Sequence, residues 1–278
     1  MVHFIMDAVA ALDLSAAHIN ERGTGKAQYP PSMRLGLLIY SYATVTFSSR
    51  RIETLTYENV AVRHLTADTH PDHDSICAFR RNHKELLSSA FHQVIELAAR
   101  ARILRLGDLT MLIVGQHVTD QANDKQQLVP TLAVVSPALG EVDKVLVDSG
   151  YHSEPAVAEV EQGGAGGQPS PMVYAAMKRQ RHGRSVAQLE ERAGPPAPPP
   201  DAPVAERMAH RLGTKEGREI HGLRKQTVEP VFGIIKEVLG FRRFLLRGRE
   251  KVSLEWELVS TSYNLKRLFN LGMRLKGV

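Results

Sequence analysis

The stretch Lys144-Val-Leu-Val-Asp-Ser-Gly-Tyr151 decides the fold class that this sequence favours. Three consecutive apolar residues between a lysine and an aspartate predict a short buried strand, and Ser149 and Gly150 predict a turn after it. Ligand chemistry in α/β sheets gathers at the C-terminal ends of parallel strands. Asp148, at the end of this strand, is therefore a candidate functional carboxylate, although an acid that only caps its own turn would look the same.

Apolar runs flank this strand on both sides. Residues 109–118 predict a strand, residues 122–135 a helix and residues 171–176 one more strand. A strand, helix, strand order indicates an α/β unit with parallel pairing. Glycines cluster at residues 163–167, and six prolines fall within residues 195–203. These features predict a flexible insertion over about residues 160–204.

Residues 1–105 predict a helical N-terminal domain, so the whole chain is expected to have a mixed α+β fold, with a second domain over residues 106–278. A short helix ending in Arg80 and Arg81 is followed by a longer helix from Lys84. Short helices with basic ends are typical of helix-turn-helix DNA-binding domains, and they are equally typical of any small helical bundle. Arg80 and Arg81 are candidate DNA contacts.

Positive charge concentrates toward the C-terminal part of the chain. Between Glu206 and Lys251 there are twelve Lys and Arg against six Glu and no Asp, an excess of +6 where the whole chain carries +5. Glu229 lies in this region, with Arg224, Lys225 and Lys236 around it. A carboxylate that can hold a divalent metal, with cations that can hold phosphates beside it, suits chemistry on a phosphodiester. The alternative for Glu229 is a helix-entry acid before Pro230.

A second basic stretch follows, in which Arg242, Arg243 and Arg247 alternate with aromatic and aliphatic residues. Guanidinium groups suit phosphate contacts, so these arginines are candidate DNA-binding residues. A solvated loop whose phenylalanines belong to the core explains the same pattern. The last helix, predicted over residues 250–271, carries a leucine-rich stripe that indicates packing.

Composition excludes several classes of protein. No apolar run approaches the ~20 residues of a membrane span. Cys77 is the one cysteine, which excludes an intramolecular disulfide and suits a cytoplasmic protein. His70, His73 and His83 lie close in sequence, but a zinc site needs four ligands and Cys77 is the one available thiolate. A zinc-dependent hydrolase is therefore a remote alternative.

Four segments, in order, resemble insertion-sequence transposases of the DDE superfamily. They are the helical N-terminal region with residues 71–75 and 79–80, residues 118–128, residues 147–151, and residues 214–217 with 224–236. The resemblance implies an RNase H-like catalytic domain that cuts and joins DNA ends with Mg²⁺. It makes Asp148 the second and Glu229 the third metal-binding carboxylate, and it places Arg224 and Lys236 on phosphates near the scissile bond. Its expected partner is the DNA of the element's ends, and a homodimer is possible.

The chain departs from this family in two places. His221 stands three residues before Arg224, where the family usually has tyrosine. No strand carrying the first catalytic aspartate precedes residues 109–118, and Asp108 is the nearest acid. The interpretation is an internal deletion that removed the first two strands, which leaves an incomplete RNase H-like domain. The sequence thus predicts a transposase with impaired catalysis, or alternatively a non-catalytic DNA-binding protein that competes for the element's ends.

Overall fold

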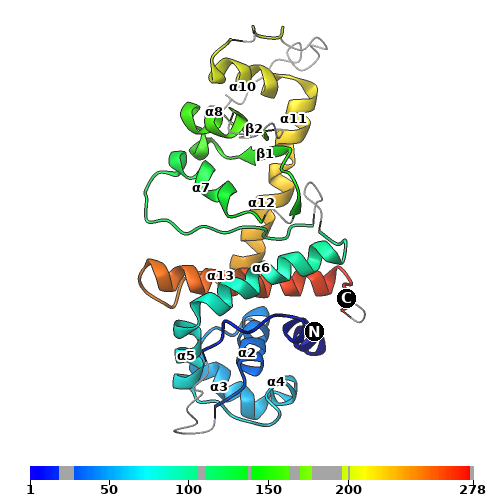
Figure 1. The fold of residues 1–278 in the computed structure, drawn as a ribbon, viewed down its shortest axis with the longest axis vertical. Coiled ribbons are helices and arrows are strands. Elements are labelled where there is room, and N and C mark those ends of the chain that lie inside the picture. Colours follow the sequence, from blue (N-terminus) through cyan, green and yellow to red (C-terminus); the bar gives the residue numbers. More distant parts are fainter. Residues whose placement is uncertain are drawn as a thin grey trace. The chain divides into compact units, whose positions relative to one another are not determined.

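The computed structural model describes residues 1–18, 28–104, 110–136, 139–162, 170–176, 196–199 and 201–275, without the side chain of Thr227. It is mostly helical with a small parallel sheet, which confirms the mixed α+β class (Figure 1). The chain folds into two compact units. Unit 1 comprises Met1–Thr119 and Phe232–Val278, and unit 2 comprises Asp120–Val231. The C-terminal helix thus belongs with the N-terminal helices, whereas the sequence pattern suggests a single boundary near residue 105.

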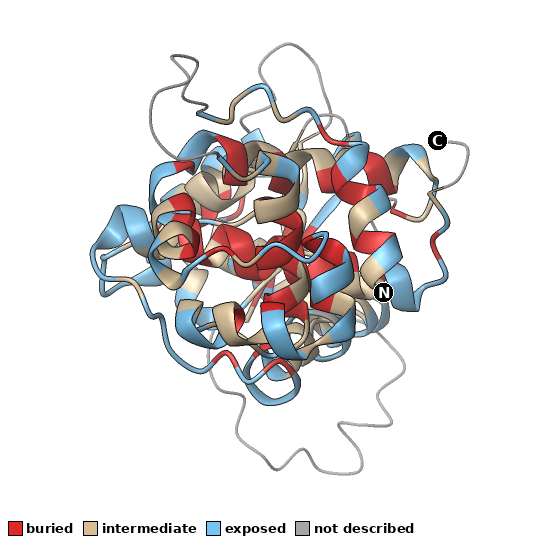
Figure 2. Cartoon of the chain, turned by 90° about the horizontal axis from the view of Figure 1, so that it is seen from below, coloured by how far each residue is buried: buried red, intermediate tan, exposed pale blue. Residues whose placement is uncertain are grey.

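Unit 1 contains the helices α1 to α6 and α13. Their bounds are α1 Val2–Ala10, α2 Pro31–Ala43, α3 Ser49–Glu58, α4 Val60–Leu65, α5 His73–Asn82, α6 Lys84–Arg100 and α13 Arg249–Asn270. α13 packs against α6 and α2 (Figure 1). The predicted stripe on α13 is buried, with Leu254, Leu258, Leu265 and Leu268 each no more than 3% exposed, and Figure 2 colours these and the other buried positions red. Burial of this stripe is the main apolar link between the two ends of the chain.

Residues 109–118 do not form the predicted strand over the part described, 110–118. Side chains of α13 bind the backbone of this segment instead. Asn264 accepts a hydrogen bond from the Ile113 amide and donates one to its carbonyl, at 2.9 and 2.8 Å, and the Tyr263 hydroxyl donates to the Met111 carbonyl at 2.9 Å. The segment is apolar, as a strand would be, but the backbone groups of Met111 and Ile113 are bound by helix side chains rather than by a neighbouring strand.

Unit 2 contains the short sheet and the helices around it. The elements are η1 Asp124–Gln126, α7 Leu128–Ala133, β1 Lys144–Val147, η3 Ser149–Tyr151, α8 Glu154–Gln162, β2 Met172–Ala175, α10 Val204–Gly213 and α11 Lys215–Gly222. β1 and β2 pair in parallel with Val145 opposite Val173, and α8 connects them. The expected parallel unit is therefore present, although its first strand is β1 rather than residues 109–118. The helix predicted over residues 122–135 is limited to η1 and α7.

The core of unit 2 is small, with Leu128, Val145, Val157, Val173, Ala175 and Met208 at its centre. Arg211 of α10 reaches over this core and pairs with Glu161 of α8 while donating to the Val173 carbonyl of β2. The same Glu161 carboxylate accepts from the Val173 amide at 3.0 Å. This pair is mostly buried, with 17% and 14% of the two side chains exposed, and it fastens three elements together. The Arg211–Glu161 pair thus adds hydrogen bonds between α8, α10 and β2 to the contacts of a small apolar core.

Helix α12 spans Arg224–Gly233 and is followed by a π-helical turn, Ile234–Val238, labelled η4. The boundary between the two units falls within α12. Pro230 lies inside this helix rather than at its first position, so the alternative of a helix entry at Glu229 does not describe this segment. Among the helices of the described residues, none is long and apolar enough to cross a membrane.

Candidate active site

Asp148 lies where β1 ends and η3 begins. Its carboxylate accepts a hydrogen bond from the Ser149 amide at 2.7 Å, which holds the side chain at the strand end. This hydrogen bond is the largest influence on the pKa of Asp148, which lies below its ordinary value. Burial opposes the shift, and the hydrogen bond and charge of Arg224 lower the pKa further. The Asp148 carboxylate is therefore ionised at neutral pH, and 64% of its side chain is exposed.

Arg224, the first residue of α12, joins the two predicted carboxylates. One of its terminal nitrogens lies 2.7 Å from Asp148 Oδ1, and the other lies 3.6 Å from Glu229 Oε1. Asp148 comes from a strand end and Glu229 from the second turn of a helix, so the fold brings together two acids that are far apart in sequence. Both predicted carboxylates face one cation, and all three residues belong to unit 2.

His221 and Tyr151 line the same corner of unit 2. Burial, and then the charge of Arg224, lower the pKa of His221, while Asp148 opposes that shift. Burial raises the pKa of the Tyr151 phenol, and the charges of Asp124 and Asp148 raise it further. At neutral pH the imidazole is uncharged and the phenol keeps its proton, so Arg224 supplies the positive charge beside Asp148.

A short turn keeps α10 and α11 close together just before this site. The Thr214 hydroxyl accepts a hydrogen bond from the Gly217 amide at 3.0 Å and so caps α11. A Cβ atom at Gly217 would lie 1.8 Å from the Arg211 carbonyl oxygen, a distance that excludes every side chain. Gly217 therefore permits the close turn from which the chain continues to Arg224.

The two carboxylates fit part of a divalent-metal site. Mg²⁺ is usually held by one or two carboxylates together with substrate phosphates. Asp148 and Glu229 already share one cation, the Arg224 guanidinium, which marks a position where positive charge is stable between them. Within the described part of the chain no group of three His, Cys, Asp or Glu could hold a metal ion. This donor set suits one ion rather than two.

Two protein-family models match the chain. The model described as "Transposase DDE domain" matches residues 200–269, which include Arg224, Glu229 and the basic stretch after them. The model described as "Transposase domain (DUF772)" matches residues 3–82, most of the N-terminal helices. The chain belongs to the insertion-sequence transposases of the DDE superfamily. This confirms the family that the four segments resembled.

The two matches leave part of the transposase uncovered. Asp148 and the β1–α8–β2 unit lie between the matched ranges. No curated protein and no solved structure matches the chain. The role of Asp148 in this transposase therefore depends on its geometry beside Arg224.

Arg80 is the predicted DNA contact that the structure corrects. Its side chain is buried, and its guanidinium donates to the Tyr42 hydroxyl at 2.7 Å and to the Phe47 carbonyl at 3.1 Å. Glu255, which is fully buried, lies 3.8 Å from the same guanidinium. A cation surrounded by these partners cannot reach a phosphate, so Arg80 stabilises the core of unit 1.

The other predicted DNA-binding cations of the transposase lie at the surface. Lys225 is exposed in unit 2. The predicted cations that are exposed in unit 1 are Arg81, Lys236, Arg242, Arg243 and Arg247. Arg224 is the exception, because its guanidinium is turned to the two carboxylates. Asp108, the nearest acid to the expected first aspartate, lies outside the described residues.

The histidines considered for zinc have separate partners in the transposase. A ring nitrogen of His70 lies 3.1 Å from the Thr56 hydroxyl, and one of His73 lies 2.8 Å from the Glu53 carboxylate. His83 hydrogen-bonds the Phe79 carbonyl at 3.0 Å.

The sequence pattern does not single out Arg51, which lines a cleft of unit 1 together with Arg242 and Arg243. The one feature of the sequence that could have indicated Arg51 is its position as a basic residue in the first turn after the Ser48-Ser49 helix start.

Proposed function

We propose that this transposase binds the DNA at the ends of its own element and that Asp148 and Glu229 are what remains of its catalytic centre. The observation that carries the proposal is the single guanidinium of Arg224 lying 2.7 and 3.6 Å from the two acids. In this proposal β1, α8 and β2 are the surviving part of an RNase H-like sheet. Unit 1 then supplies most of the DNA-binding surface.

Asp148, Glu229 and Arg224 each have a defined role in this proposal. Asp148, ionised and oriented by the Ser149 amide, and Glu229, on the face of α12 next to Arg224, would hold Mg²⁺. When bound, the ion would neutralise charge on the scissile phosphate and lower the pKa of the attacking hydroxyl. Arg224 holds the two acids close together while no phosphate is present.

Two observations support impaired catalysis. No group of three acidic, histidine or cysteine side chains in the described residues could hold a metal ion, whereas the family's chemistry uses three carboxylates. Residues 110–118, expected to be the third strand of the domain, are held by α13 side chains rather than by a sheet. Two acids can position one ion, but they leave the second position of a two-metal mechanism without a ligand.

A non-catalytic role is the alternative that a separate observation favours. The +6 excess over residues 206–251 and the exposed Arg242, Arg243 and Arg247 suit DNA binding that needs no cleavage. Such a protein would occupy the element's ends and block an intact enzyme. Pairing two ends at once would require two copies, so a homodimer belongs to either version of the proposal.

A binding and cleavage assay tests the proposed function. Purified protein is mixed with a labelled duplex that carries the DNA flanking its coding region, with a scrambled duplex of equal length as the control. We expect a retarded complex that favours the flanking sequence, together with no more than trace nicking in Mg²⁺ or Mn²⁺. Absence of any complex would contradict the proposal. Efficient cleavage that Asp148→Asn abolishes would contradict the impairment and leave the site assignment intact.

A further inference from the structure

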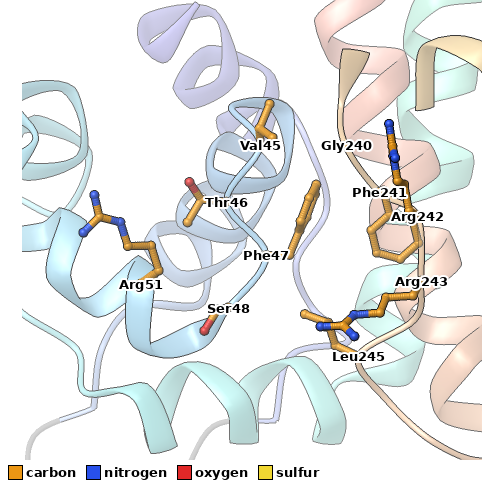
Figure 3. A pocket seen from close by; sticks show the side chains of 10 residues that line it. All are labelled: Val45, Thr46, Phe47, Ser48, Arg51, Gly240, Phe241, Arg242, Arg243 and Leu245. Carbon is orange, nitrogen blue, oxygen red and sulfur yellow. The ribbon is translucent and has the colours of Figure 1, made fainter. Parts of the chain in front are cut away.

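Unit 1 contains a cleft that has no part in the proposed catalytic centre, because Asp148, Arg224 and Glu229 belong to unit 2 and do not line it. It has a volume of about 370 Å³ and lies between residues 45–48 with Arg51 on one side and residues 240–243 with Leu245 on the other (Figure 3). Val45, Phe47, Phe241 and Leu245 give it an apolar lining. The volume is at the lower end of the range for small-ligand pockets.

The polar side chains that line this cleft are cationic or neutral. Arg51, Arg242 and Arg243 carry three positive charges, and no acid among the described residues lines the cleft. Arg51 and Arg242 have exposed acidic partners outside it, Glu58 at 3.7 Å and Glu237 at 2.5 Å. Exposed pairs of this kind contribute about 0–1 kcal/mol, so a phosphate can replace the carboxylate at little cost.

Arg243 has the most direct access to the cleft. Its side chain extends from the loop of residues 240–245 toward the side on which Ser48 lies (Figure 3). No ion pair joins Arg243 to an acid of the described residues. Its guanidinium therefore has donors available for an anion within the cleft.

One buried network fixes both walls of the cleft. Arg80 donates to the Phe47 carbonyl and to the Tyr42 hydroxyl, which holds the first wall. Glu255 accepts from the amides of Leu245 and Leu246 at 2.7 and 3.0 Å, which holds the second wall. The Tyr42 hydroxyl donates to Glu255 at 3.2 Å and so connects the two halves.

The backbone at the mouth of the cleft is constrained as well. Val45 has a φ of 68°, in the left-handed region that β-branched residues avoid, and Gly240 opposite has a φ of 66°. A Cβ at Gly240 would lie 3.2 Å from a Val45 methyl group, so the two walls already approach closely there. A cleft with fixed walls binds a ligand without the entropic cost of ordering them.

We propose that this cleft binds one phosphodiester of the element's DNA, with the adjoining deoxyribose packed against Phe47. The phosphate is held by Arg243 and by Arg51 (Figure 3), whose guanidinium turns from Glu58 into the cleft when the phosphate binds. The inference deepens the proposed function and rests on it, because the occupant is the same DNA. Three arginines without an acid are complementary to a phosphate. The apolar lining favours a phosphate that carries an organic group over the free ion.

Neighbouring arginines of α3 provide a matched pair of variants. Arg51 lines the cleft, whereas Arg50 is exposed on the same helix and does not line it. We expect Arg51→Gln and Arg243→Gln each to weaken binding of a labelled duplex about tenfold at low salt. Each should also reduce the slope of log K against log salt by about 0.9, the value for one phosphate contact. Arg50→Gln should leave the slope within error of the wild-type value.

Competitors identify the part of the DNA that the cleft recognises. A deoxynucleoside monophosphate should displace the duplex from the wild-type protein at lower concentration than inorganic phosphate does, and the difference should disappear in Arg243→Gln. Equal competition by the two anions would overturn the role of the apolar lining. If the wild-type chain binds DNA and the Arg50, Arg51 and Arg243 variants all keep its salt slope, the cleft proposal fails and the proposed function stands. If the wild-type chain binds no DNA, both fail.

Discussion

Replacing Arg80 by leucine is expected to lower the free energy of unfolding of unit 1 by about 3–5 kcal/mol, the usual effect of removing one partner from a buried ion pair. Glu255 is fully buried, and Arg80 is the cation beside it at 3.8 Å. Without that cation the Glu255 carboxylate stays buried and keeps only neutral donors, the Tyr42 hydroxyl and two backbone amides. A buried charge without a counter-ion is among the most costly features of a folded protein.

Urea unfolding followed by the fluorescence of Trp256, the single tryptophan of the chain, measures this effect, because Trp256 lies on α13 in unit 1. Arg81→Leu is the matched control, since Arg81 is the next residue of the same helix and is exposed. It should change the free energy of unfolding by no more than about 0.5 kcal/mol. Equal effects of the two substitutions would contradict the assignment of Arg80 to the core.

Replacing Gly217 by alanine is expected to destabilise the α10–α11 turn by about 3 kcal/mol or more, at or above the upper end of the usual cost of overpacking. The new Cβ would lie 1.8 Å from the Arg211 carbonyl oxygen and 2.9 Å from the Thr214 hydroxyl. Both contacts involve the backbone or the cap of α11, so no flexible side chain can move to relieve them. The turn itself must open, and with it the approach of the chain to Arg224.

Gly222→Ala provides the control on the same helix. No heavy atom outside its own helix backbone lies within 4 Å of a Cβ at Gly222, and alanine should stabilise this position by about 0.4–1 kcal/mol. Hydrogen exchange of the peptides covering α10 and α11 measures both variants within unit 2. Unchanged protection of these peptides in Gly217→Ala would show that the close turn does not exist in solution.

The sequence predicted the elements whose patterns are local. The stripe of α13 repeats at helical spacing, and β1 and β2 are short apolar runs with turn residues beside them, so periodicity was sufficient for all three. Residues 109–118 have the same strand-like pattern, but the prediction of a strand is wrong over the described part, 110–118. An apolar segment becomes a strand only if another strand lies beside it, and here Tyr263 and Asn264 of α13 bind its backbone instead.

The predicted site shows the same limit. A strand end predicts Asp148 and a family motif predicts Glu229, and the fold brings both to Arg224. Arg80 looked like a surface cation because it ends a short helix, and its burial depends on Tyr42 and Glu255, which are distant in sequence. No local pattern marks Arg51 as a cleft residue, because the loop of residues 240–245 forms the other side of its cleft. Contacts between distant segments decide which cations remain at the surface.

We propose that Asp148 and Glu229 face one cation position, which Arg224 fills in the absence of DNA. Binding of Mn²⁺, measured by electron paramagnetic resonance, tests this claim in the wild-type protein, in Arg224→Gln, and in Arg224→Gln combined with Asp148→Asn or Glu229→Gln. Removing the guanidinium should strengthen Mn²⁺ binding about three- to tenfold, a modest gain because both acids are exposed. Replacing either acid should abolish that gain. The same Mn²⁺ affinity in all four proteins would contradict the claim.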